Sequence, residues 1–230
     1  MNHSQTRIAI FGDSITWGYD PQTGLRYENR FVRILEKWHP NWTILEDGQC
    51  GRLAWNQDPY FDDLNGSRQI ETFIQQAAPY DVLILQLGSN DARRMFHGTF
   101  EAWSRDLTKF VEKSVQLSRS ICPMADILLM SPPLPYPNLN EISNCMEYAC
   151  QFGHSGSEIL LQAASFEKNL ARKYHLSFLD CQKDGIHGGQ WDGIHPDAQM
   201  QIQIAKSLNT KLESLLSQKE ETGKKEHDER

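Results

Sequence analysis

The sequence lacks the features that would place it in several broad classes of protein. Its 230 residues contain no apolar run long enough to cross a bilayer, so we expect no membrane partner. Basic residues are not in excess, because 23 lysines and arginines stand against 30 aspartates and glutamates, a formal net charge of -7. Nucleic-acid binding needs a basic surface for the phosphate backbone, so we expect no nucleic-acid partner.

Cysteine is scarce and irregularly spaced. The five cysteines form no CxxC pair, which argues against a disulfide framework and a structural zinc site, and we expect reduced, buried thiols. The first apolar run, Ile8 to Phe11, is too short for a secretory signal, so cytoplasm is the expected compartment. No GxSxG elbow follows a predicted strand, which disfavours a hydrolase of the elbow type.

Short apolar, β-branched runs alternate with stretches of helical periodicity. This alternation predicts an α/β fold with parallel strands in βα repeats, forming one domain over 1–217, followed by a charged, disordered tail over 218–230. The predicted strands are Ile8–Phe11, Trp42–Leu45, Asp81–Leu87, Asp126–Met130 and Leu176–Leu179. The predicted helices are Glu28–Lys37, Ser67–Gln76, Thr99–Arg119, Glu158–Tyr174 and Pro196–Leu216.

Chemistry-bearing residues follow the predicted strands, at the edge where open α/β sheets bind their ligands. Ser14, in Gly12-Asp13-Ser14, is either a nucleophile or a helix N-cap. Asn90 and Asp91 follow the most apolar strand, and they either present an amide to an oxyanion or close an Asx turn. Gly51 lies in a glycine turn after the second strand and offers a further N–H donor.

The tetrapeptide Asp-Gly-Ile-His occurs twice, at 184–187 and 192–195. A carboxylate three residues before a histidine can orient the imidazole toward a serine. We favour Asp192 and His195, because an amphipathic helix follows His195 directly, whereas His187 leads into Gly188-Gly189 and is expected to be mobile. A metal site built from both copies is a weaker alternative, since no HExxH or similar ligand spacing supports it.

The order of these motifs resembles the SGNH (GDSL-type) hydrolase superfamily over residues 8–216. Within it, the arylesterase and acyltransferase group is the most similar. The motifs that carry the resemblance are Gly12-Asp13-Ser14-Ile15-Thr16-Trp17-Gly18, Leu64-Asn65-Gly66, Leu87-Gly88-Ser89-Asn90-Asp91, Ser131-Pro132-Pro133 and Asp192-Gly193-Ile194-His195. The resemblance implies a flavodoxin-like three-layer α/β/α sandwich with strand order 2-1-3-4-5.

The resemblance also implies the roles of individual residues. It makes Ser14 the nucleophile, His195 the base and Asp192 the residue that orients it. The N–H groups of Ser14 and Gly51 and the side chain of Asn90 become the oxyanion donors. The implied contacts to the substrate come from Trp17, Asp13 and Arg52.

The expected activity is therefore hydrolysis of a small-molecule carboxylic ester through an acyl-Ser14 intermediate, without a metal or cofactor. Transfer of the acyl group to alcohols is known in the similar group. One alternative is a carbohydrate O-acetyl esterase with Trp55, Tyr60 and Tyr136 as a sugar platform; another is a non-catalytic binding protein. The aromatic segment Leu53–Phe61 favours self-association into a homo-oligomer.

Overall fold

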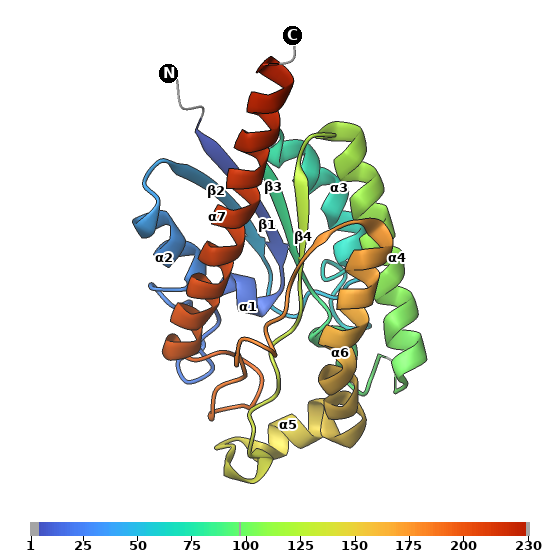
Figure 1. Cartoon of the computed structure of the whole chain (residues 1–230). Helices are drawn as coiled ribbons and strands as arrows, with labels where there is room; N and C mark the ends of the chain where they lie inside the picture. The colour runs from blue at the N-terminus through green and yellow to red at the C-terminus, as the bar shows by residue number, and fades with distance from the viewer. Residues whose placement is uncertain (1–4, 97, 229–230) are drawn as a thin grey trace.

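The computed structural model describes residues 5–96 and 98–228, and its centre is a parallel sheet of five strands in the order β2-β1-β3-β4-β5 (Figure 1). This order confirms the flavodoxin-like topology that the resemblance implied. Each predicted strand overlaps one observed strand, although the ends differ by a few residues. The strands are β1 (Thr6–Gly12), β2 (Trp42–Gly48), β3 (Val82–Gln86), β4 (Asp126–Met130) and β5 (Ser177–Leu179).

Helices cover both faces of the sheet and make the three layers (Figure 1). Helices α2 and α7 lie on one face, and α3, α4 and α6 lie on the other. The helices are α1 (Ser14–Trp17), α2 (Phe31–Trp38), α3 (Gly66–Ala77), α4 (Phe100–Ile121), α5 (Cys145–Gln151), α6 (Gly153–Tyr174) and α7 (Ala198–Asp228), with short 3-10 turns η1 (Asn90–Ala92) and η2 (Leu139–Glu141).

The alternation of side chains along β1 divides the core into two clusters. Ile8 and Ile10 pack toward α2 and α7, whereas Ala9 and Phe11 pack toward α3 and α4, and all four are fully buried. Successive residues of a strand point to opposite faces, so a strand covered on both sides must be apolar at every position. This explains why the predicted strands appear as continuous apolar runs.

Three details of the helices differ from the sequence-based predictions. Helix α5 has no counterpart among the predicted helices. Ile202, an apolar residue of the predicted amphipathic helix Pro196–Leu216, is 43% exposed. Helix α7 continues through Asp228, so most of the expected disordered tail is helical, and 229–230 lie outside the described residues. Lys, Glu and Gln have high helix propensity, and extending an existing helix avoids the cost of nucleation.

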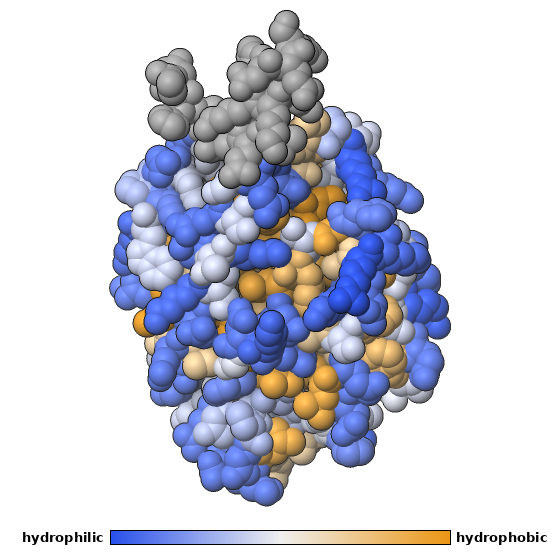
Figure 2. Space-filling model, viewed as in Figure 1, coloured by the Kyte–Doolittle hydropathy of each residue, from blue (hydrophilic) through white to orange (hydrophobic). Residues whose placement is uncertain are grey.

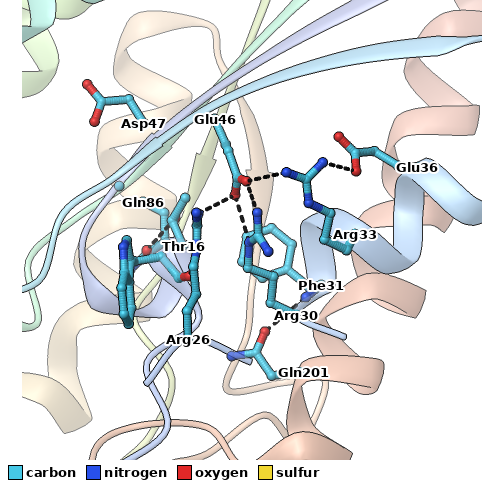
Figure 3. Close-up of polar contacts among 12 residues, drawn as sticks. Thr16, Arg26, Arg30, Phe31, Arg33, Glu36, Glu46, Asp47, Gln86 and Gln201 are labelled. Atoms are coloured by element: carbon cyan, nitrogen blue, oxygen red, sulfur yellow. Dashed lines mark hydrogen bonds and ion pairs between the residues drawn. The ribbon is translucent and has the colours of Figure 1, made fainter. Parts of the chain in front are cut away.

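An ion-pair cluster around Glu46 fixes the edge strand β2 to its neighbours (Figure 3). Arg26 Nη2 lies 3.1 Å from the Glu46 carboxylate, Arg30 Nε donates to it at 3.1 Å, and Arg33 lies at 3.9 Å. Arg33 also pairs with Glu36 at 2.5 Å. These arginines come from α2 and from the 18–30 connection, which joins α1 to α2. The cluster therefore holds this connection against the sheet.

Helix α2 begins with a cap from another element. Arg30, at its N-cap, makes no side-chain capping bond, and the Phe31 N–H instead donates to Gln201 Oε1 of α7 at 3.0 Å (Figure 3). An unpaired N–H at a helix start must find an acceptor when it is buried. Gln201 therefore joins the two helices of this face.

Figure 2 shows hydrophilic side chains over the helices of the viewed face, with an apolar strip between α7 and α6. Within the described part of the chain, no helix combines the length and apolarity needed to span a bilayer. The cysteines are unpaired, but only Cys122 and Cys181 are buried; Cys50, Cys145 and Cys150 are exposed, contrary to the expectation of buried thiols.

Candidate active site

The sharp turn between β1 and α1 presents Ser14. The Asp13 carboxylate accepts the Ile15 N–H at 2.9 Å, so Asp13, and not Ser14, is the side chain that caps α1. A Cβ atom at Gly12 would lie 2.0 Å from Thr16 Oγ1, so only glycine allows the chain to turn here. Ser14 therefore stands at the carboxyl end of β1 with its hydroxyl free of a capping role.

Ser14, His195 and Asp192 form a continuous chain of hydrogen bonds. Ser14 Oγ lies 2.8 Å from His195 Nε2, and His195 Nδ1 lies 2.5 Å from Asp192 Oδ2. The other oxygen of Asp192 accepts the N–H groups of Ile194 at 3.0 Å and His195 at 2.9 Å. Burial acts to raise the pKa of Asp192, but the hydrogen bonds from His195 and these two amides outweigh it and hold that pKa below its usual value. The ionised carboxylate can thus fix the imidazole with Nε2 toward the serine.

The Asp-Gly-Ile-His copy at 184–187 and the two glycines after it pack beside the copy at 192–195. His187 Nδ1 lies 2.7 Å from the Gly188 carbonyl, and its ring packs edge-on against Tyr136. The expectation that His187 is mobile does not fit these contacts, and the two glycines that follow it are also packed. Gly189 N–H donates to the His195 carbonyl at 2.7 Å, and a Cβ atom at Gly188 would lie 2.2 Å from the Gly193 carbonyl oxygen. Glycine is needed here because backbone packs directly on backbone.

The two histidines therefore have separate partners and do not meet around a common point. In the described ranges, no group of three or more His, Cys, Asp or Glu side chains is arranged to hold a metal ion. The alternative of a four-ligand metal site from both tetrapeptides does not match this geometry.

The loops after β2 and β3 are joined beside Ser14. Asn90 Nδ2 donates to the Arg52 carbonyl at 3.2 Å, and both oxygens of Asp91 lie 3.0 Å from the Ala54 N–H. These bonds cross between loops, so the alternative of a local Asx turn is not what the structure shows. Gly51 adopts φ +82°, in the region that favours glycine. The network fixes Gly51 and Asn90 relative to each other at the wall of the cavity.

Asp91 gives this network a pH-dependent stability. Burial raises the pKa of Asp91 to about 7, although the Ala54 N–H opposes the shift. The folded state then binds the proton more tightly than the unfolded state, so stability falls as pH rises from about 4 to 7. We expect the fall in unfolding free energy between pH 5 and 7 to be about 2–3 kcal/mol smaller in Asp91→Asn than in the wild type, measured by urea denaturation. Equal falls in both proteins would contradict this assignment.

A cavity of about 310 Å³ opens above the serine at the carboxyl ends of the strands. Helix α5 lies across the opening of the cavity and is fixed at both ends. Just before the helix, the Asn144 N–H donates to the Trp191 carbonyl at 2.8 Å. At the end of the helix, the Gln151 carbonyl accepts the Arg94 N–H, also at 2.8 Å. The cavity thus has one end near Trp191 and His195 and another near Asn90 and Arg93. The lining residues are Ser14, Tyr19, Pro21, Cys50, Gly51, Asn90, Arg93, Asn144, Glu147, Tyr148, Gln151, Phe152, Trp191, Asp192, Ile194 and His195.

Three residues predicted to contact the substrate lie outside this cavity. Asp13 is fully buried beneath Ser14 as the cap of α1. Arg52 is 2% exposed, because its guanidinium donates to Asp47 and to the Gly12 carbonyl and lies over the Phe11 ring. Trp17 packs against Tyr19 and beneath Arg26. Each is held by contacts within the fold, and none of the three is part of the cavity wall.

Tyr19 and Trp191 are aromatic residues that line the cavity, although the sequence-based predictions did not include them. The Tyr19 ring lies 4.7 Å from the His195 ring, and burial raises the pKa of Tyr19, so the phenol stays neutral. Trp191 is 41% exposed at the cavity rim. Of the expected sugar platform, Trp55, Tyr60 and Tyr136, none lines the cavity. Trp191 precedes Asp192 directly, and this adjacency was the signal available in the sequence.

Comparison with known proteins agrees with this architecture. The crystal structure of a carbohydrate acetylesterase family member from Sinorhizobium meliloti is 28% identical, with 92% of this chain and 99% of that chain covered and a TM-score of 0.78. The M. smegmatis aryl esterase is 24% identical, with coverage of 91% and 99% and a TM-score of 0.76. A search of curated protein sequences found no significant match. Residues 10–201 match the GDSL-like lipase/acylhydrolase family, and the chain belongs to that family.

Proposed function

We propose that the protein is a serine esterase that cleaves small carboxylic esters through an acyl-Ser14 intermediate. The observation that carries the proposal is the hydrogen-bonded chain from Ser14 through His195 to Asp192, facing a cavity of about 310 Å³. A serine, an imidazole and an ionised carboxylate in this geometry are the parts of a nucleophilic hydrolase.

In the first half of the reaction, Ser14 Oγ attacks the ester carbonyl carbon while its proton passes to His195 Nε2. The oxyanion that forms is stabilised by the N–H groups of Ser14 and Gly51 and by the Asn90 amide. The carbonyl-to-alkoxy C–O bond then breaks, and the imidazolium returns the proton to the leaving alcohol. Asp192 remains ionised and stabilises the imidazolium.

In the second half, water attacks the acyl-serine carbonyl carbon while His195 Nε2 accepts one of its protons. The bond between the acyl carbon and Ser14 Oγ then breaks, the carboxylic acid leaves, and the imidazolium returns the proton to Ser14 Oγ. An alcohol in the position of that water would carry the acyl group away as a new ester. The amount of new ester formed in the presence of methanol measures how far acyl transfer competes with hydrolysis.

The test is hydrolysis of p-nitrophenyl acetate by the wild type and by Ser14→Ala, with EDTA present throughout. We expect turnover that is insensitive to EDTA and falls by at least about 10³-fold in Ser14→Ala, because the nucleophile is lost. Intact-protein mass spectrometry should detect an acyl adduct on the wild type alone. Equal turnover by both proteins, or a wild type without turnover on any acyl length, would overturn the proposal.

A carbohydrate ester is the second candidate substrate, favoured by the Trp191 end of the cavity. Trp191 offers an aromatic face, while Asn144 and Glu147, near the start of α5, offer hydrogen-bonding groups to the same cavity. An aromatic surface with nearby amide and carboxylate groups suits the apolar face and hydroxyls of a sugar. The similarity to the carbohydrate acetylesterase family member supports this candidate. Acetylated monosaccharides should then be better substrates than aryl acetates, and Trp191→Ala should remove that preference.

A further inference from the structure

Arg93 brings a positive charge to the cavity above Ser14. Among the described residues that line the cavity, Arg93 is the only lysine or arginine. The acidic residues of the lining are Glu147 and Asp192, and His195 lies at the reaction centre. The Arg93 side chain is 17% exposed, so it lies largely within the protein yet reaches the cavity. A chain with a net charge of -7 has no general excess of cations to place there.

The guanidinium of Arg93 uses little of its hydrogen-bonding capacity. Its Nε donates to the Asn90 carbonyl at 3.3 Å and its Nη2 to the Gly51 carbonyl at 3.5 Å, both long contacts. Asp58 lies behind it at 3.8 Å, and the guanidinium stacks over the Phe96 ring. No acceptor within the described ranges bonds to Nη1. A partly buried guanidinium with spare donors is suited to a carboxylate, which it can bind through two parallel bonds.

The reaction geometry decides which part of an ester would reach Arg93. His195 gives its proton to the leaving alcohol, so the alcohol must lie at the end of the cavity formed by His195 and Trp191. The acyl chain then extends the other way, past the oxyanion donors Gly51 and Asn90. Arg93 contacts the carbonyls of both of these residues, so it lies at the acyl end.

We propose that Arg93 is a specificity residue for esters whose acyl group ends in a carboxylate, that is, monoesters of short dicarboxylic acids. The inference rests on the proposed acyl-Ser14 chemistry and names the acyl group that it favours. The terminal carboxylate would accept hydrogen bonds from Arg93 while the ester carbonyl sits against Gly51 and Asn90.

The experiment compares matched substrates on the full chain. The mono-p-nitrophenyl esters of succinate, glutarate and adipate are each paired with the neutral butanoate, pentanoate or hexanoate of equal length, with spontaneous hydrolysis subtracted. We expect kcat/KM to favour the anionic ester at one length by about 10- to 100-fold, as a charged hydrogen-bonded pair allows. In Arg93→Gln that ratio should fall by at least about tenfold, and added salt should lower it in the wild type.

Arg94→Gln is the matched control, because it removes the same charge from the neighbouring residue, which is exposed and does not line the cavity. Its substrate ratio should equal that of the wild type. The proposal is overturned if the wild type shows no preference at any length, or if Arg93→Gln slows both members of a pair equally, since Arg93 would then only hold the oxyanion loops. Failure of the proposed function is distinct, because Ser14→Ala would then retain activity toward every ester.

Discussion

Replacing His195 with alanine should lower kcat by at least about 10⁴-fold, whereas His187→Ala should retain activity within a fewfold of the wild type. The two histidines sit in identical tetrapeptides, but only His195 has Nε2 on Ser14 and Nδ1 on a carboxylate. His187 bonds to the Gly188 carbonyl and packs on Tyr136, outside the cavity. The measurement is kcat on p-nitrophenyl acetate for both variants.

The double variant Ser14→Ala/His195→Ala provides a further check. Residues that act as one catalytic unit are not additive, so it should be no slower than the slower single variant. Circular dichroism on each variant separates loss of chemistry from loss of folding. An inactive His187→Ala beside an active His195→Ala would move the catalytic pair to the first tetrapeptide.

Asn90→Ala should lower kcat by about 10²–10³-fold, with a smaller change in KM. The Asn90 amide uses one N–H to reach the Arg52 carbonyl, which fixes its direction and leaves its second N–H for the oxyanion. The oxyanion exists only in the tetrahedral state, so losing this donor raises the barrier more than it weakens binding of the ester.

Urea denaturation of Asn90→Ala is the control for that prediction. Asn90 is only partly buried, so the substitution should change stability much less than it changes kcat. If kcat fell only in proportion to unfolding, or did not fall, Asn90 would have no place in the mechanism. The Asp91→Asn variant should in contrast change the pH dependence of stability, because it removes the buried carboxyl group whose pKa burial raises to about 7.

The strands and the two motifs that carry Ser14 and His195 could be predicted from the sequence, because their signals lie in neighbouring residues. A strand buried on both faces must be a continuous apolar run, and Ile8 to Phe11 shows that pattern without reference to other segments. Gly12-Asp13-Ser14 and Asp192-Gly193-Ile194-His195 each carry their geometry within one turn, as the capping bond of Asp13 and the Asp192–His195 bond show. The strand order, taken from the family resemblance, was confirmed by the structure.

The tertiary structure alone decided which side chains line the cavity. Trp17 and Arg52 stand next to catalytic motifs in the sequence, yet contacts with distant residues such as Arg26 and Gln69 turn them into the scaffold. Arg93 and Trp191 reach the cavity because α5 bridges the two loops that carry them, and that bridge joins residues more than forty positions apart in the chain. Backbone turns are encoded by neighbouring residues, whereas the lining of a cavity depends on long-range packing that no local pattern records.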